Sequence, residues 1–298
     1  MQKIVPHLWF DTEASDAAQF YTGIFKNSSI QSATTLDGTP SGKVGLLTIE
    51  LDGQEFMLIS AGPYFKFTPA ISFLVACNTK EEVDYLWDNL GELGKVMMPL
   101  KTYPFSEHYG WVEDRYGLSW QLMYRGEKKS AQKIIPTLMF TGVQRGRAEE
   151  ALRFYTSIFH DSAIADITRY EPQAEPNAEN AVMHASFALD NLEFAAMDNA
   201  YENSFSFNEA ISFVVSCDSQ EEVDYYWDAL SAHPESEQCG WLKDKYGVSW
   251  QIVPSIMATM MSEKNPKQLS RVTAAFLKMK KFDIAALKRA ALTDDEQN

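Results

Sequence analysis

The sequence predicts an α+β protein made of two tandem copies of one domain, followed by a helical tail. Residues 70–77 reappear almost unchanged as residues 210–217, and residues 81–88 reappear as residues 221–228, both 140 positions later. Within each copy the hydrophobic pattern predicts a strand, a helix and three strands, and this order occurs twice. A repeat of about 125 residues exceeds the ~20–50 residues of a solenoid unit, so the repetition indicates a duplicated domain.

The domain boundaries follow from where the matches begin and end. The closing segment, Tyr109–Gln121, reappears as Cys239–Gln251 only 130 positions later, because the second copy has lost about ten residues after its second helix. We therefore assign residues 1–126 to the first domain, 127–133 to a charged linker, 134–254 to the second domain and 255–298 to the tail.

Local signals place the elements of the first copy. Residues 4–10 read as a strand, and Asp11 or Thr12 can cap the helix that follows it. Asp52-Gly53 is a two-residue hairpin turn between two strands. The expected order is strand 4–10, helix 13–25, strands 30–36, 43–51 and 55–60, strand 71–76, helix 80–90, and strands 96–100, 109–113 and 119–124. The second copy follows the same order.

Each βαβββ module leaves one face of its sheet without a helix. Two modules side by side in one domain are expected to form a curved mixed sheet with the helices outside. The inner face of that sheet is then an apolar cup lined by alternate residues of several strands, which is a common shape for a ligand site. The two domains form an intrachain pseudo-dimer, to which the C-terminal helices are added.

Composition and charge exclude several functional classes. The formal net charge of −15 argues against nucleic-acid binding and against docking on an anionic membrane. No apolar run approaches the ~20 residues of a membrane helix, and no signal peptide precedes the first strand. The three cysteines, Cys77, Cys217 and Cys239, have no spacing typical of a disulfide framework or a zinc site. A cytoplasmic protein is expected.

Specific motifs resemble a known family. Pro-x-Leu-x-Phe opens both copies, and Gly-Trp-x-x-Asp-x-Tyr-Gly-x-Ser-Trp-Gln closes both. This set resembles the PhnB-like branch of the vicinal oxygen chelate superfamily, the glyoxalase/bleomycin resistance fold, which is often labelled 3-demethylubiquinone-9 3-methyltransferase. The resemblance covers about residues 3–124 and 133–254. It implies tandem glyoxalase-like domains and a small-molecule ligand.

The resemblance also implies where a metal would bind. Metal-dependent members have a histidine on the first strand, a glutamate on the last strand and two further ligands on middle strands. The first-strand position matches Pro6 and Pro136, which have no ligand atom; His7, next to Pro6, is expected to face the helix. The other positions hold mostly neutral residues, among them Gln121, Gln251, Ser72 and Ser212. We expect no metal and no other cofactor, since the glycine-rich turn of the usual S-adenosylmethionine fold is also missing.

Two glutamines are the strongest binding candidates. Gln121 and Gln251 are each polar in an otherwise apolar strand. A buried amide needs hydrogen-bond partners and can orient a ligand, although a neighbouring loop satisfies it equally well. Ser72 and Ser212 are weaker candidates of the same kind, because nothing places a base beside either serine.

Four further residues complete the candidate set. His184 can bind a ligand or act as an acid–base group near neutral pH if it faces the cup; the alternative is a strand histidine bonded to the backbone. Trp111 and Trp241 can reach the cup rim and stack on a flat ligand, or pack as core. Cys239 is a candidate nucleophile, although no neighbouring His or Lys is evident to lower its pKa.

The tail predicts two helices. Asn265-Pro266 is a helix start, and an apolar stripe follows it, formed by Leu269, Val272, Phe276 and Met279. Asp283 can cap a second helix over residues 284–292. From residue 264 onward there are eight basic residues against four acidic ones, so the tail is positive on a negative body. We expect the stripe to pack on the two domains or to join two chains in a homodimer.

The sequence thus predicts a small-molecule-binding protein or a metal-independent enzyme of this superfamily, with an unassigned reaction. One alternative is a non-catalytic binder of the sequestering or resistance type. Another is a scaffold whose cups are filled by Trp and Phe side chains. Polar residues that converge in an open cup favour either of the first two, whereas filled cups favour the scaffold.

Overall fold

The computed structural model describes residues 2–126, 132–171, 181–199, 201, 203–262 and 265–292. The first copy contains two βαβββ modules. Their elements are β1 (Ile4–Phe10), α1 (Ala14–Ile24), β2 (Ser29–Thr39), β3 (Gly42–Leu51) and β4 (Gln54–Ser60), then β5 (Ile71–Cys77), α2 (Lys80–Gly91), β6 (Lys95–Tyr103), β7 (Ser106–Glu113) and β8 (Ser119–Tyr124).

The second copy repeats this order and leads into the tail. Its elements are β9 (Ile134–Phe140), the short helix η1 (Gly142–Gln144), α3 (Ala148–Ile158), β10 (Ala163–Arg169), β11 (Val182–Leu189) and β12 (Leu192–Asp198), then β13 (Ile211–Cys217), α4 (Gln220–Leu230), η2 (Pro234–Ser236), β14 (Trp241–Lys243) and β15 (Ser249–Pro254). The tail contains α5 (Ile256–Ser262), which the sequence does not predict, followed by the expected α6 (Pro266–Phe276) and α7 (Ile284–Ala291).

Each of the two sheets draws one module from each copy. Sheet A has the strand order β14-β15-β13-β1-β4-β3-β2, and sheet B has the order β10-β11-β12-β9-β5-β8-β7-β6. The copies meet where β1 runs antiparallel to β13, and again where β5 runs antiparallel to β9. The α+β class and the mixed sheets are confirmed. One detail is corrected: the two modules of one copy lie in different sheets.

The near-identity of two strands is compatible with this exchange. The strand 71–77 and its counterpart 211–217 present almost the same side chains, so β1 can pair with either. In the observed register, Pro6 lies opposite Phe213 in sheet A, and Pro136 lies opposite Phe73 in sheet B. The sequence pattern specifies the register, but it does not specify which copy supplies the partner strand.

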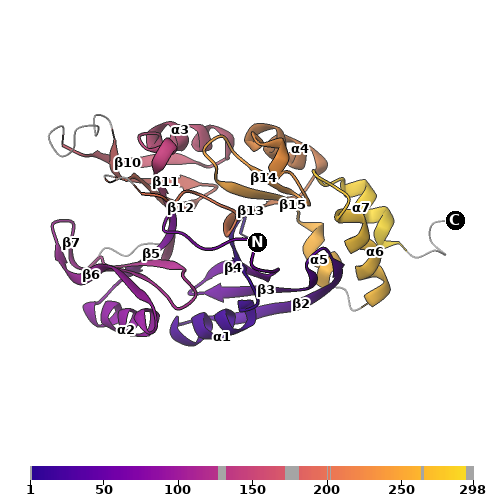
Figure 1. Ribbon diagram of the computed structural model, residues 1–298. Coiled ribbons are helices and arrows are strands. Elements are labelled where there is room, and N and C mark those ends of the chain that lie inside the picture. Colours follow the sequence, from indigo (N-terminus) through magenta and orange to yellow (C-terminus); the bar gives the residue numbers. More distant parts are fainter. Residues whose placement is uncertain are drawn as a thin grey trace.

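The helices of the modules cover the outer faces of the sheets. In Figure 1, α1 and α2 lie along one side of the molecule, α3 and α4 along the other, and the tail helices gather at one end. One continuous hydrophobic core lies between the sheets and these helices. Trp120 and Trp250 are both in this core, at 0% and 1% exposure, so alternation along the strand places the neighbouring glutamines on the opposite face.

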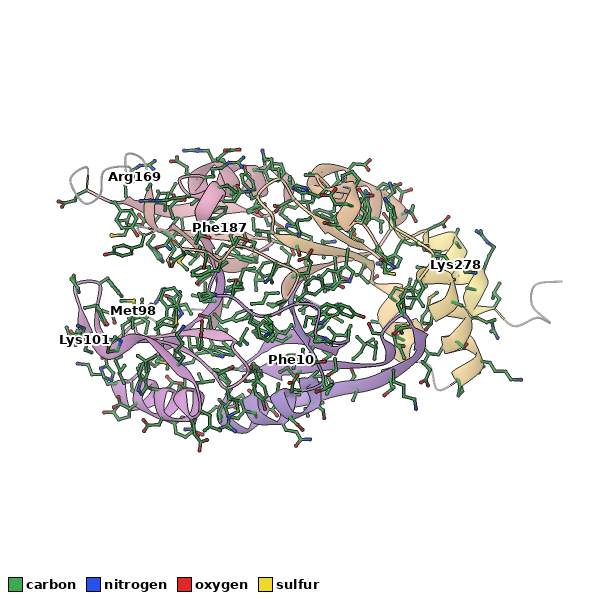
Figure 2. All side chains as sticks on the ribbon, viewed as in Figure 1. Phe10, Met98, Lys101, Arg169, Phe187 and Lys278 are labelled. Atoms are coloured by element: carbon green, nitrogen blue, oxygen red, sulfur yellow. The ribbon has the colours of Figure 1, made fainter. Side chains whose placement is uncertain are left out.

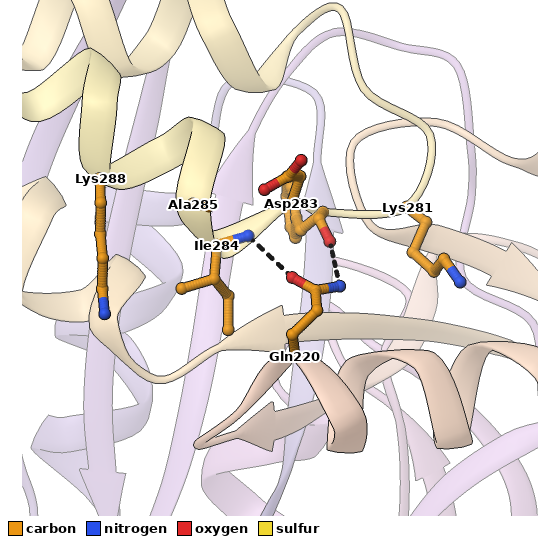
Figure 3. A pocket seen from close by; sticks show the side chains of 7 residues that line it. Gln220, Lys281, Asp283, Ile284, Ala285 and Lys288 are labelled. Atoms are coloured by element: carbon orange, nitrogen blue, oxygen red, sulfur yellow. Dashed lines mark hydrogen bonds between the residues drawn. The ribbon is translucent and has the colours of Figure 1, made fainter.

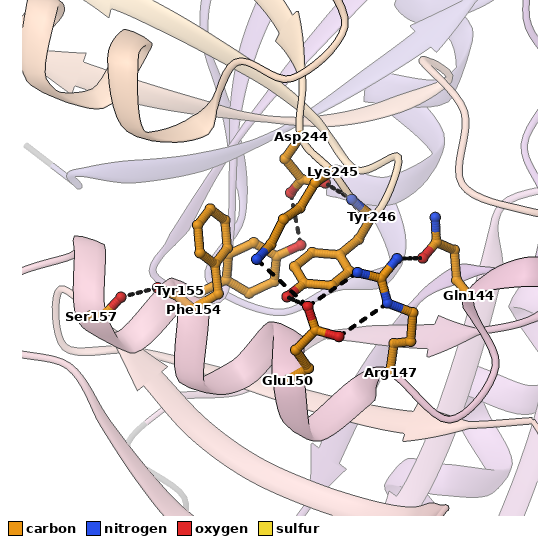
Figure 4. Close-up of polar contacts among 9 residues, drawn as sticks. All are labelled: Gln144, Arg147, Glu150, Phe154, Tyr155, Ser157, Asp244, Lys245 and Tyr246. Carbon is orange, nitrogen blue, oxygen red and sulfur yellow. Dashed lines mark hydrogen bonds and ion pairs between the residues drawn. The ribbon is translucent and has the colours of Figure 1, made fainter.

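A buried aspartate ties each closing strand to the first helix of its copy. In the second copy, Tyr155 donates to Oδ2 of Asp244 at 2.7 Å (Figure 4). Trp250 donates to the same oxygen at 2.8 Å, and two backbone N–H groups donate to Oδ1. Asp114 has the same four kinds of donor in the first copy. Burial raises the pKa of each carboxyl, and the four donors oppose that rise. The Asp-x-Tyr-Gly motif is therefore structural.

The cap of the first helix differs from the expectation. Neither Asp11 nor Thr12 caps α1; Oγ of Ser60, at the end of β4, accepts the backbone N–H of Ala14 at 3.0 Å. This end of the helix is thus satisfied from the neighbouring strand, which local sequence signals do not reveal.

The tail docks on the body through backbone and side-chain hydrogen bonds. The N–H of Cys239 donates to the carbonyl of Met279 at 2.8 Å, and the N–H of Gly240 donates to that of Lys280 at 2.8 Å. Gln220 donates to the carbonyl of Phe282 and accepts the N–H of Ile284 (Figure 3). The surface pocket of about 490 Å³ in Figure 3 lies at this junction.

Opposite charges reinforce this docking. Lys281 pairs with Asp224 on α4 at 2.8 Å, and Lys280 pairs with Glu237 at 3.2 Å. Positive tail residues thus lie against acidic residues of the body, and the tail packs on its own chain as expected. Association of two chains through these helices stays a prediction. Within the described ranges, no helix is long and apolar enough to cross a membrane.

Candidate functional site

Each sheet has an inner face, which we define as the face turned away from helices α1–α4. On β1, alternate residues Ile4, Leu8 and Phe10 belong to the core under the helices. His7 and Trp9 have the opposite parity and lie on the inner face of sheet A. The same alternation places Gln121 and Met123 of β8 on the inner face of sheet B, because Trp120 and Leu122 are in the core.

The tail covers the inner face of sheet A. Leu36, Val44 and Ala61 of this face form a hydrophobic cluster and are only 4–5% exposed. Three tail residues pack against this cluster: Met261 of α5, and Leu269 and Phe276 of α6. The sheet itself contributes Trp9, Leu46 and Ile59. The part of this inner face formed by β2 and β3 is therefore covered by the protein's own tail.

The inner face of sheet B is lined by methionine and aromatic side chains. A second cluster contains the buried residues Tyr109, Trp111 and Met139, and packed against it are Met97, Met98, Tyr103, Met123, Met197 and Phe205. None of these residues comes from the tail. Figure 2 shows Met98 on β6, on the side that faces the half of the molecule containing β10–β12. This face keeps partly exposed, adaptable apolar surface.

Gln121 sits at the centre of a hydrogen-bonded relay on this face. The hydroxyl of Tyr109 donates to Oε1 of Gln121 at 2.7 Å, and Nε2 of Gln121 donates to Oγ of Ser72 at 2.8 Å. All three side chains are at most 3% exposed. Burial raises the pKa of Tyr109, so its hydroxyl stays protonated and acts as a donor. The relay brings together Gln121 and Ser72, two of the candidates from the sequence, and Tyr109 is the member that sequence reasoning missed.

The counterpart in sheet A is a shorter arrangement. Nε2 of Gln251 donates to Oγ of Ser212 at 3.0 Å. Cys239 occupies the sequence position of Tyr109, so no phenol reaches the glutamine. The structure places Cys239 in the turn that bonds to Met279 of the tail, and burial raises the pKa of its thiol. That environment does not generate a thiolate nucleophile.

His7 faces the opposite way from the expectation. Its ring contacts Trp241 edge-on, with centroids 5.5 Å apart, on the inner face of sheet A. It neighbours Met57 on β4 and Ser212 on β13. The expectation that it faces the helix is wrong, because Pro6 has the parity of the core residues Ile4 and Leu8. His7 is 5% exposed, and its buried Nδ1 has no hydrogen-bond partner among the residues that the structure describes.

The residues at the family's metal positions do not fit a metal. In sheet A the adjacent set is His7, Met57, Ser212 and Gln251. In sheet B it is Thr137, Ala195, Ser72 and Gln121. The first set offers one imidazole and no carboxylate, and the second offers neither, whereas a divalent site needs several such donors. Among the described residues, no group of three or more His, Cys, Asp or Glu side chains could hold an ion.

The two predicted tryptophans both lie on inner faces. Nε1 of Trp111 donates to Oγ of Ser119 at 2.6 Å, and the ring is 9% exposed within the methionine cluster. Trp241 packs edge-on against His7 and Trp9. Oγ of Ser249, the counterpart of Ser119, is buried and has no hydrogen-bond partner within the described part of the chain. Trp111 is thus held as part of the wall of sheet B, and Trp241 fills sheet A.

His184 and Arg125 add polarity to the inner face of sheet B. His184 lies opposite Thr168 in the register of β10 and β11 and is partly buried. Burial and the charge of Arg125 lower its pKa, while Asp166 opposes them. Sequence reasoning missed Arg125 because it begins the charged stretch at the domain boundary. Its alternation with Gln121 and Met123 was the available signal.

Known proteins resemble the chain in sequence. A family model described as 3-demethylubiquinone-9 3-methyltransferase matches residues 2–123 and 132–253. A candidate 3-demethylubiquinone-9 3-methyltransferase, the PhnB protein from Bacillus cereus, is 41% identical over 41% of this chain and 99% of its own, with a TM-score of 0.39. No curated protein matches the chain.

Two solved structures resemble both copies together. Glyoxalase I from Zea mays is 11% identical and covers 86% of this chain and 95% of its own, with a TM-score of 0.55. A candidate dioxygenase from Bacillus subtilis is 10% identical and covers 96% of both chains, with a TM-score of 0.50. At such identity the likeness concerns the fold alone. The chain therefore belongs to the 3-demethylubiquinone-9 3-methyltransferase family, with two tandem family domains, and its fold resembles that of glyoxalase I.

Proposed function

We propose that this protein binds a small, largely apolar molecule on the inner face of sheet B. One observation carries the proposal: the two equivalent inner faces of one chain are used differently. The tail packs on sheet A, while sheet B presents methionine and aromatic side chains around the Gln121 relay. The covered side of sheet A is the part of the molecule that the scaffold alternative would fit.

The side chains of sheet B suit an apolar ligand with one or two polar groups. Methionine is flexible and polarizable, so a wall rich in methionine adapts to ligands of irregular shape. Trp111 and Tyr103 add flat surface for a ring. The amide of Gln121, held by Tyr109, gives a fixed polar point in this apolar surface.

The geometry favours binding over the chemistry in the family's name. Ser72 accepts a hydrogen bond from a neutral amide, not from a base, so it is not activated as a nucleophile. The sequence has no glycine-rich turn of the usual S-adenosylmethionine fold. In the enzyme alternative, His184 is the acid–base group, because its lowered pKa leaves it neutral and able to accept a proton at pH 7.

The cysteines bear on the cellular location of the protein. Cys77, Cys217 and Cys239 are all free, and the first two are buried. Burial raises the pKa of Cys77 and Cys217 to about 12, so both stay as thiols. A cytoplasmic location, where thiols are kept reduced, is part of this proposal.

Fluorescence titration with N-phenyl-1-naphthylamine, a neutral apolar probe, tests the site. Met98→Asp places a charge on the inner face of sheet B, and we expect it to weaken binding by about tenfold or more, from the loss of a buried apolar contact. Met57→Asp is the matched control on the inner face of sheet A, and we expect little change. Circular dichroism checks that both variants fold. Absence of saturable binding, or equal loss in both variants, overturns the proposal.

A further inference from the structure

The two copies differ at positions that carry charge. By sequence alignment of the copies, Arg125 corresponds to Ser255, and His184 corresponds to Leu46. The backbones match, because the N–H of Arg125 donates to Cys77 at 2.9 Å and that of Ser255 donates to Cys217 at 2.8 Å. The inner face that the tail covers therefore has an alcohol and a leucine, where the other face has a guanidinium and an imidazole.

The guanidinium of Arg125 has no partner among the described residues. Its Nε is buried without a hydrogen bond, and it forms no ion pair with the described part of the chain. In contrast, Arg115 pairs with Glu92 at 2.5 Å, and Arg147 pairs with Glu150 at 3.1 Å. A buried donor without an acceptor is costly, so such an arginine usually has a ligand or a second role.

The charge of this arginine acts on the imidazole of His184. The positive charge of Arg125 lowers the pKa of His184, after the larger effect of burial, and Asp166 raises it. Arg125 directly follows β8, two residues after Met123, and His184 lies on β11, which pairs with β12, the strand of Met197. Met123 and Met197 pack in the same methionine cluster. Two nitrogen-bearing side chains from opposite walls of the curved sheet thus share one region beside the methionine cluster.

We propose that Arg125 and His184 bind the acidic group of an amphipathic organic anion, whose apolar body lies on the methionine and aromatic side chains of the inner face of sheet B. This inference rests on the proposed function and names the class of ligand. A planar guanidinium binds an oxyanion through two parallel N–H bonds, which suits a carboxylate, sulfonate or phosphate ester. Neutral His184 donates one further N–H to the same group.

A pair of probes that share one ring system separates the charge from the apolar contact. 1-Anilinonaphthalene-8-sulfonate carries an anionic group that N-phenyl-1-naphthylamine lacks. We expect Arg125→Met to weaken binding of the sulfonate by about tenfold or more, the range of a lost charged hydrogen bond. Binding of the neutral probe changes less than about twofold. Arg125→Lys, which keeps the charge, recovers most of the affinity for the sulfonate.

Arg115→Met is the matched control, because it removes one positive charge from an arginine that already has a carboxylate partner. It is expected to leave both affinities unchanged. If Arg125→Met weakens both probes equally, or neither, the anion site is refuted while the apolar site stands. If the wild-type protein binds neither probe, the proposed function itself fails. A cooperative unfolding transition in each variant shows that the comparison concerns folded protein.

Discussion

His7 makes the stability of this protein depend on pH in a way that can be isolated. Burial lowers the pKa of His7 from 6.5 to about 3. The unfolded chain therefore binds a proton at this residue below pH 6.5, whereas the folded chain does not until about pH 3. A histidine held neutral in this way contributes its full stability above pH 6.5. That stability is lost as the pH falls from 6.5 toward 3.

The size of the effect follows from the two pKa values. At pH 4.5 the unfolded residue is two pH units below its own pKa of 6.5 and almost fully protonated, while the folded residue is almost fully neutral. Two units at 1.36 kcal/mol each give a loss of about 2.7 kcal/mol in the free energy of unfolding relative to neutral pH. This is a large part of the stability of a typical domain.

His7→Phe removes the titration and keeps a ring against Trp241. Urea unfolding of both proteins at pH 7.5 and pH 4.5, followed by circular dichroism, gives four free energies. The carboxylates that titrate in this range are common to both proteins, so they cancel in the difference between them. When the pH falls from 7.5 to 4.5, we expect the free energy of unfolding of the variant to decrease by about 3 kcal/mol less than that of the wild type. Parallel pH dependence of the two proteins refutes the assignment of His7 as a buried neutral histidine.

Two further substitutions test the body and the tail. Asp244→Asn replaces one carboxylate oxygen by an N–H donor and leaves the hydroxyl of Tyr155 without an acceptor. We expect the free energy of unfolding, measured in urea, to fall by about 3 kcal/mol. A decrease under about 1 kcal/mol contradicts the structural role. Gly240→Ala places a Cβ 2.5 Å from the ring of Phe282, so the tail should loosen and be cleaved faster by trypsin. Gly247→Ala, with a similar positive φ but only a 4.0 Å neighbour, is the control, and equal cleavage of both variants argues against a steric role for Gly240.

The sequence was sufficient where short-range periodicity decides the outcome. Alternation along the closing strand correctly separates Trp120, in the core, from Gln121, on the inner face. Asn265 and Asp283 cap the tail helices as predicted, accepting backbone N–H groups at 3.1 and 2.8 Å. These features depend on residues within a few positions of one another, which a single sequence displays directly.

Features that depend on strand register or on where the tail docks could not be predicted. The bond from Tyr109 to Gln121 requires the register of β7 on β8, which the alternation within either strand does not specify. The orientation of His7 was misjudged because proline was matched to the ligand position of the family, one residue away from the true inner face. The covering of sheet A by Leu269 and Phe276 depends on where the tail docks, and amphipathicity alone does not specify a partner surface.

The pairing of β1 with β13 has a consequence for how the chain reaches its final shape. These strands are about 200 residues apart, and the intervening chain already contains every strand of sheet B. During synthesis, the edge of β1 that later receives β13 has no partner until the last module has been made. Closing so long a loop is slow compared with forming a local hairpin. The exposed edge is a site where a second nascent chain could pair by mistake, so the duplication that unites four modules in one chain also prolongs the interval in which they can be exchanged between chains.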